Sequence, residues 1–143
     1  MTSYYDLVKN DTLLIADKES LSALINTEHE NLITDIYKKV LVTPGIYDFI
    51  KNLDINGIKS FNKSFKEIEF KASRTAIASI IETEGILTED EAFAMLSCMA
   101  NRMDALIDDP RKAKIFALHR INVIRPGDLA AAAVITKNIR KRR

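Results

Sequence analysis

Apolar residues recur at intervals of three and four along most of the chain, which is the spacing of one face of an α-helix. The pattern is strongest over residues 60–84, and it continues over 17–41, 44–53, 88–107, 111–121 and 129–140. Gly and Pro, the usual markers of turns between strands, number only four and three. The sequence therefore predicts an all-α fold: a single compact bundle of about six helices with no sheet.

Capping signals support several of these helix boundaries. Thr88 and Glu91 have the spacing of a capping box, in which each side chain bonds the backbone N–H of the other residue. The run Asp108-Asp109-Pro110 ends one helix and begins the next, because Asp is a good N-cap and Pro suits the first helical position. Residues 17–41 form one helix or, in our preferred interpretation, two helices with a break at 26–28.

The length and composition indicate one globular domain spanning residues 1–143. With 47% apolar and 29% charged residues, the chain resembles ordinary globular proteins. Cys98 is the only cysteine, so no internal disulfide is expected and a reducing compartment is favoured. The N-terminus lacks a signal-peptide pattern, and the apolar run 129–136 is too short to span a bilayer. We therefore expect a cytoplasmic protein without membrane contact.

The charge is divided sharply between the two ends of the chain. Residues 1–109 hold 11 Lys and Arg against 19 Asp and Glu, a net charge of −8. Residues 110–143 hold 10 basic residues against one acidic residue, a net charge of +9. A concentrated positive charge attracts polyanions and acidic protein surfaces. The basic C-terminal segment 110–143, whose end at 140–143 is expected to fray, is thus the candidate interaction region.

The basic segment predicts nucleic-acid binding as the leading function. Six residues are the expected phosphate contacts: Arg125, Lys137, Arg140, Lys141, Arg142 and Arg143. On this interpretation the chain is a small non-enzymatic intracellular regulator, of the kind common in bacteria and phages, that forms a homo-oligomer. The sequence does not decide between DNA and RNA, and a merely solvated basic tail remains the simpler alternative.

A helical protein–protein interaction module is the second hypothesis. The acidic body and the basic end would then meet within or between chains, with charge complementarity setting their orientation. Met95, Met99 and Met103 lie at helical spacing and would supply an apolar partner-binding face, although core packing explains them more simply. An immunity, chaperone-like or adaptor role would each fit.

No motif indicates catalysis. The two histidines, His29 and His119, have no metal-binding spacing, and no glycine-rich phosphate loop is present. The acidic runs 89–91 and 108–109 are imaginable as acid–base pairs, but both lie where helix starts favour negative charge. The sequence therefore predicts no catalytic residues, no metal, no cofactor and no enzymatic activity.

Overall fold

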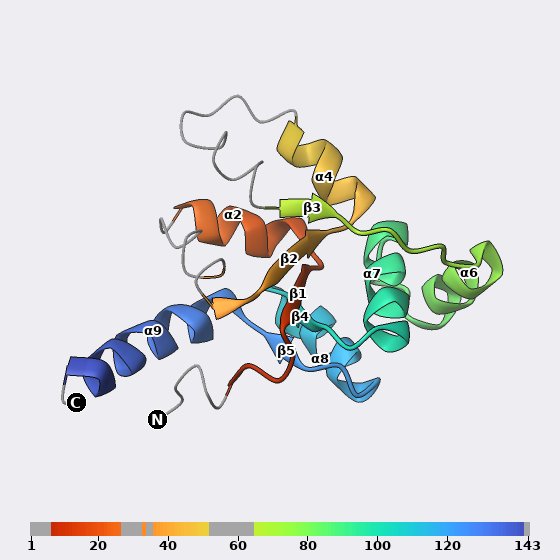
Figure 1. The fold of residues 1–143 in the computed structure, drawn as a ribbon. Helices are drawn as coiled ribbons and strands as arrows, with labels where there is room; N and C mark the ends of the chain where they lie inside the picture. The colour runs from red at the N-terminus through yellow and green to blue at the C-terminus, as the bar shows by residue number, and fades with distance from the viewer. Residues whose placement is uncertain (1–6, 27–32, 34–35, 52–64, 142–143) are drawn as a thin grey trace.

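The computed structural model describes residues 7–26, 33, 36–51 and 65–141 (Figure 1). This part of the chain contains strands alternating with helices. The elements, in chain order, are β1 (Thr12–Ile15), α2 (Lys18–Asn26), β2 (Lys39–Val42), α4 (Pro44–Lys51), β3 (Phe65–Glu67), α6 (Arg74–Thr83), α7 (Glu89–Ala100), β4 (Asp104–Leu106), α8 (Pro110–Leu118), β5 (Val123–Ile124) and α9 (Pro126–Lys141). The five strands form one sheet in the order β3-β2-β1-β4-β5, and every neighbouring pair is parallel.

The central strand β1 explains why the sheet is buried on both faces. Leu13 and Ile15 belong to one apolar cluster, whereas Leu14 and Ala16 belong to another, because successive side chains of a strand point to opposite faces. All four residues are at most 1% exposed. A parallel sheet needs this double cover, since each crossover connection lays a helix on one face.

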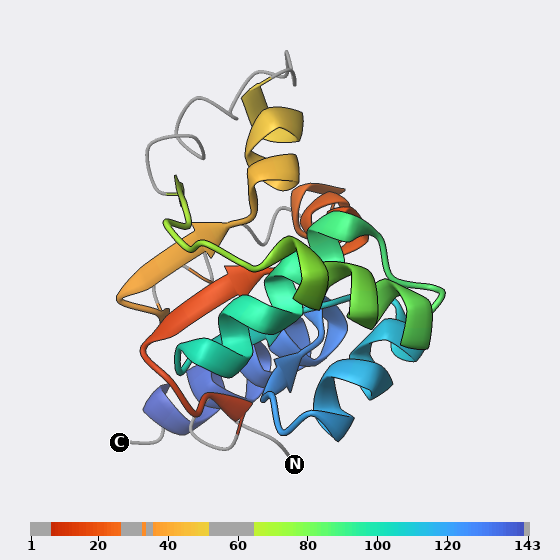
Figure 2. The ribbon, with the colours of Figure 1, turned by 90° about the vertical axis from the view of Figure 1, so that its right-hand side faces the viewer.

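Two helical layers provide the cover. Residues of α2, α4 and α9 pack in the cluster that contains Leu13, and residues of α7 and α8 pack in the cluster that contains Leu14. Figures 1 and 2 show the sheet between these two layers, with α6 lying against the outer side of α7. The molecule is therefore a three-layer α/β structure in the described residues.

The strand order creates a switch point between β1 and β4. The chain moves outward from β1 through β2 to β3 and then returns to place β4 on the other side of β1. The connections after β1 and β4 consequently leave the sheet in different directions, and open α/β sheets bind ligands in the crevice at such a point, beyond the carboxyl ends of the strands. The residues that follow β1 and β4 are thus the first place to seek a site.

The predicted all-α bundle without a sheet is wrong. Strand β4 occupies the end of the helix predicted over 88–107, β3 lies within the helix predicted over 60–84, and β2 overlaps the end of the helix predicted over 17–41. The strands are two to four residues long, and their buried residues are apolar except for Asp104. Short apolar runs of this kind do not differ from a buried helix segment in periodicity alone, and only their long-range pairing identifies them.

The predicted starts of α7 and α8 are confirmed, although the predicted helix lengths are not. The capping box is confirmed: Glu91 N–H donates to Thr88 Oγ1 at 3.1 Å, and Thr88 N–H donates to Glu91 Oε1 at 2.9 Å. Asp109 caps α8 through the backbone N–H of Arg111 at 2.9 Å, with Pro110 at the first helical position. Among the described residues, none of the helices has the length and apolar character needed to cross a membrane.

Candidate functional site

Asp17 lies two residues beyond the end of β1, directly at the switch point. Its carboxylate accepts hydrogen bonds from the backbone N–H of Ser20 at 2.9 Å, of Asp108 at 3.1 Å and of Asp109 at 3.4 Å. The first contact caps α2, and the other two join the end of β1 to the end of β4. The residue is only 2% exposed, and this burial raises the pKa of Asp17, although the hydrogen bonds act in the opposite direction. A buried carboxylate is thereby fixed between the two strands.

Glu91 approaches the same point from α7. Its Oε1 accepts the hydrogen bond of the capping box, so its Oε2 is the oxygen that contacts a group outside the helix. The residue is 5% exposed. The helix N-terminus favours a negative charge at this position, and the capping box fixes its direction.

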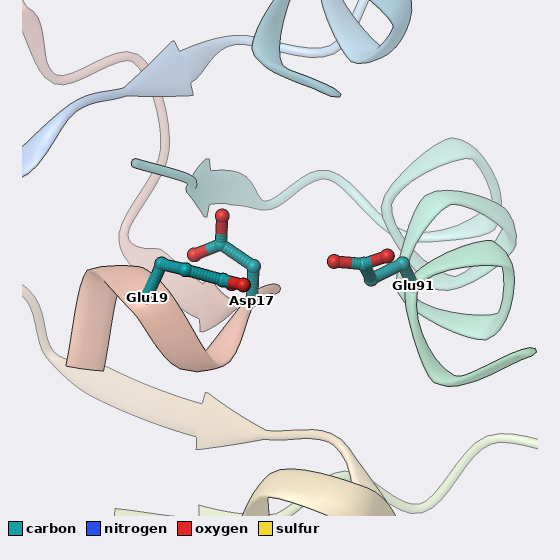
Figure 3. Close-up of side chains that lie close together, drawn as sticks. All are labelled: Asp17, Glu19 and Glu91. Atoms are coloured by element: carbon teal, nitrogen blue, oxygen red, sulfur yellow. The ribbon is translucent and has the colours of Figure 1, made fainter. Parts of the chain in front are cut away.

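Glu19 completes a group of three carboxylates. Asp17, Glu19 and Glu91 each offer an oxygen within 4.8 Å of the others, with Glu19 as the exposed member. Figure 3 shows Asp17 and Glu19 at the start of α2, across from Glu91 on α7. We call these three residues the acidic cluster. Carboxylate oxygens are the ligands that Mg²⁺ and Mn²⁺ prefer, so the donor set fits a hard divalent cation.

Lys112 supplies a positive charge to the acidic cluster from the first turn of α8. Its Nζ donates to Glu91 Oε2 at 2.6 Å, and the two side chains are 12% and 7% exposed. Burial by itself would lower the pKa of Lys112. The hydrogen bond to Glu91 and the charges of Glu91, Glu19 and Asp17 outweigh that effect and raise this pKa, so the side chain stays protonated.

Asp90, next to Glu91 in sequence, is directed elsewhere. Thr43 Oγ1 and the backbone N–H of Gly45 both donate to its carboxylate, the latter at 2.9 Å. The fit is close, since a Cβ added at Gly45 would lie 2.7 Å from Asp90 Cγ. Asp90 therefore holds the start of α4 and is distinct from the acidic cluster.

Arg125 is the predicted phosphate contact whose side chain the structure describes. It follows β5 at the same edge of the sheet, and its guanidinium donates to the backbone oxygen of Asp108 at 2.7 Å. Because the N–H of Asp108 also donates to Asp17, Arg125 is one residue removed from the acidic cluster. Lys137, Arg140 and Lys141 lie on α9, and the structure describes the backbone of these three residues; Arg142 and Arg143 lie outside the described residues.

The three methionines proposed as a partner-binding face lie in different environments. Met95 and Met103 are buried in the core at 1% and 5% exposure, whereas Met99 is 53% exposed. They do not form one exposed apolar surface. Met95 and Met103 pack with Cys98 in the cluster on the α7 side of the sheet.

Sequence reasoning missed Asp17, Glu19 and Lys112 as site residues and interpreted Glu91 only as a cap. The missed signal is the apolar run 13–16 followed at once by Asp17. Had that run been taken as a buried strand, an acidic residue at its carboxyl end would have indicated a site. Convergence with Glu91 and Lys112 depends on the fold, so local patterns do not contain it.

The described fold is similar to that of a PilT N-terminus domain protein from the hyperthermophilic archaeon Sulfolobus solfataricus P2, with a TM-score of 0.52. The match covers 85% of this chain and 91% of that chain at 14% sequence identity, so the likeness concerns the fold. No family model matches the chain, and no curated protein matches its sequence.

These findings correct the functional predictions. The helical regulator and the helical interaction module are both wrong, because the chain is not an all-α bundle. The prediction of no enzymatic activity is also overturned, since the chain has the α/β fold of a PilT N-terminus domain protein and carries the acidic cluster. The comparison gives no support to the expected homo-oligomer.

Proposed function

We propose that this chain is a metal-dependent nuclease that cleaves phosphodiester bonds of a nucleic acid at the acidic cluster. The observation that carries the proposal is the convergence of Asp17, Glu19 and Glu91 within 4.8 Å at the switch point of a PilT N-terminus fold. Domains of this fold are typically nucleases of this type and bind RNA or DNA. A cytoplasmic location remains part of this proposal.

The three carboxylates would have different roles in the reaction, because they differ in burial. Asp17 and Glu91 are buried and fixed by backbone hydrogen bonds, so they would hold a divalent cation. Such a cation, when bound, lowers the pKa of water and polarises a phosphoryl oxygen. Glu19 is exposed, and its carboxylate is therefore the one that water and substrate would reach directly.

Basic residues elsewhere in the chain would offset the repulsion between the acidic cluster and a polyanion. Arg125 lies beside Asp108, and we propose it as a phosphate contact next to the site. Lys137, Arg140, Lys141, Arg142 and Arg143 remain proposed contacts to more distant phosphates. The proposal thus keeps the sequence-based prediction that the basic C-terminal residues contact phosphates, but in an α/β enzyme.

A cleavage assay tests the proposal directly. End-labelled single-stranded RNA, single-stranded DNA and duplexes are incubated with the protein and Mg²⁺ or Mn²⁺, and parallel reactions contain EDTA. Glu91→Gln and Asp17→Asn should each lower the rate by at least about 100-fold, because replacing even an outer-shell partner of a metal ligand costs about 10- to 100-fold. Glu89→Gln, an exposed acid in the same turn as Glu91, is the matched control and should cleave as the wild type does.

Two results would contradict the proposal. Cleavage that persists in EDTA, or that is equal in Glu91→Gln and the wild type, would mean that the activity does not use the acidic cluster. Removal of residues 137–143 addresses the basic end separately. It should reduce the dependence of binding on salt, by about 0.7 to 0.9 in the logarithmic slope for each phosphate that this segment neutralises.

A further inference from the structure

Lys112 occupies a position inside the acidic cluster that ordinary surface lysines do not reach. Its Nζ lies 2.6 Å from Glu91 Oε2, and both side chains are almost fully buried. The charges of Glu19 and Asp17 also act on the same ammonium. The cluster thus already contains a cation that belongs to the chain.

The start of α8 explains why this lysine, among several nearby basic residues, is the one turned inward. Asp109 and Pro110 fix the first turn of the helix, and Lys112 is its third residue. Arg111, one position earlier, has a side chain that is 73% exposed, and Lys114 is exposed two positions later. The inward direction of Lys112 is set by the helix register and is not shared by its neighbours.

The ammonium and a divalent cation would compete for the same oxygen. Glu91 Oε1 is engaged by Thr88 N–H, so Oε2 is the oxygen left for a metal, and Lys112 holds it. Two cations so close in a buried site repel each other strongly, because the surroundings screen charge less than water does. This repulsion favours movement of the ammonium away from Glu91 when a metal binds at this oxygen.

We propose that Lys112 is a built-in counter-ion that occupies the cation position of the acidic cluster and must be displaced before a divalent metal binds. In the metal-free protein it balances part of the negative charge of Asp17, Glu19 and Glu91. Metal affinity is consequently set below what the three carboxylates alone would give. The proposal rests on the metal site of the proposed function, but it concerns metal affinity and makes no use of cleavage.

Calorimetric titration with MnCl₂ tests this competition on the full chain. Lys112→Met removes the charge and keeps an apolar stem, and Lys114→Met is the matched control on the same helix. Lys112→Met should bind Mn²⁺ about tenfold more tightly or better, as expected when an opposing charge a few ångströms away is removed. Lys114→Met should bind as the wild type does. Equal or weaker binding by Lys112→Met would overturn the proposal.

A second readout follows folding without any metal. In EDTA, Lys112→Met should unfold at a lower temperature than the wild type, because the carboxylates then repel one another without a counter-ion. Mn²⁺ should restore its unfolding temperature, and adding Glu91→Gln to Lys112→Met should restore part of it in EDTA. If Lys112→Met does not fold, Lys112→Gln is titrated in its place, since it keeps a neutral donor for Glu91. An unfolding temperature unchanged in EDTA would contradict the counter-ion role.

The two proposals fail in different ways. Tighter Mn²⁺ binding by Lys112→Met without cleavage by either protein supports the counter-ion and overturns the nuclease. Metal-dependent cleavage with equal Mn²⁺ affinity in both proteins supports the nuclease and overturns the counter-ion. If neither protein binds Mn²⁺, the counter-ion proposal falls together with the metal basis of the proposed function.

Discussion

Asp17 and Asp104 are two buried aspartates at opposite ends of the strands of one sheet, and their hydrogen-bond partners and charged neighbours differ. Asp104 begins β4, is 0% exposed, and accepts hydrogen bonds from the Tyr37 hydroxyl at 2.7 Å, Asn10 Nδ2 at 2.8 Å and the N–H of Lys9 at 3.1 Å. All three donors are uncharged groups, and they tie the N-terminal segment to the sheet.

Asp17 has backbone donors as well, but it also faces two further carboxylates and an ammonium. One buried carboxylate with enough neutral donors forms a complete structural contact. Several carboxylates gathered at one point carry an excess of charge that the fold does not need. The comparison indicates that Asp104, at the amino end of β4, stabilises the fold. The acidic cluster, beyond the carboxyl end of β1, is the candidate for metal binding and catalysis.

Asp104→Ala should produce the largest loss of stability. It leaves the buried Tyr37 hydroxyl and two further donors without their acceptor, at a cost of about 1 to 3 kcal/mol per orphaned group, and we expect about 3 kcal/mol in total. Urea denaturation measures the loss. Asp11→Ala, which removes only the exposed pair of Asp11 with Lys38, is the control and should change the midpoint little. If Asp104→Ala unfolded at the wild-type urea midpoint, Asp104 would not be the structural anchor described here.

Asp17→Asn should change metal-linked stability and leave the fold largely intact. The wild type should gain about 2.7 kcal/mol when Mn²⁺ is present at 100 times its dissociation constant, and Asp17→Asn should gain almost nothing. Without metal the variant should remain folded, because an amide oxygen can still accept from the backbone of Ser20. Denaturation with Mn²⁺ and with EDTA separates the two effects. Equal stabilisation of the wild type and Asp17→Asn by Mn²⁺ would contradict the metal-binding role that distinguishes Asp17 from Asp104.

The smallest expected effect concerns the reactivity of the Cys98 thiol, which depends in part on the charge of Asp104. Burial, with a further contribution from the charge of Asp104, raises the pKa of its thiol to about 12. The native thiol should therefore react with a disulfide reagent roughly 1,000-fold more slowly at pH 8 than an ordinary cysteine, since the thiolate is the nucleophile. Asp104→Asn removes one of the two causes and should speed the reaction several-fold.

The sign of the pH dependence follows from the same thiol. The folded state favours the neutral thiol, so its contribution to stability is complete below the unfolded pKa of about 8.5 and is lost as pH rises from there toward 12. Cys98→Ala should lose less stability over that interval, as measured by urea denaturation from pH 8 to 10. Parallel losses in the two proteins would mean that the thiol is not held neutral by the fold.

Local chemistry could be predicted from the sequence, and long-range pairing could not. The capping box of Thr88 and Glu91 was predicted and is present. Either Asp108 or Asp109 was expected to cap the next helix, and Asp109 does so. These contacts could be predicted because they span at most three residues. The strands were missed because runs as short as Asp104–Leu106 become strands only through pairing with β1, about 90 residues away.

The acidic cluster shows the same limit. Glu91 was assigned one role, although its two oxygens serve two: Oε1 completes the capping box and Oε2 faces Lys112. Asp17 was placed at the start of a helix, which is correct, but the strand before it was not recognised. The site exists because β1, α7 and α8 converge at the switch point, and no local pattern records that convergence.

Anomalous diffraction from a crystal soaked in MnCl₂ tests most directly whether the acidic cluster is a metal site. We expect a manganese peak bonded to oxygens of Asp17 and Glu91, with Glu19 beside it and Lys112 Nζ moved away from Glu91. The Asp104 region should show no peak. A soaked crystal in which the Lys112–Glu91 pair remains intact and no manganese lies between the three carboxylates would contradict the assignment.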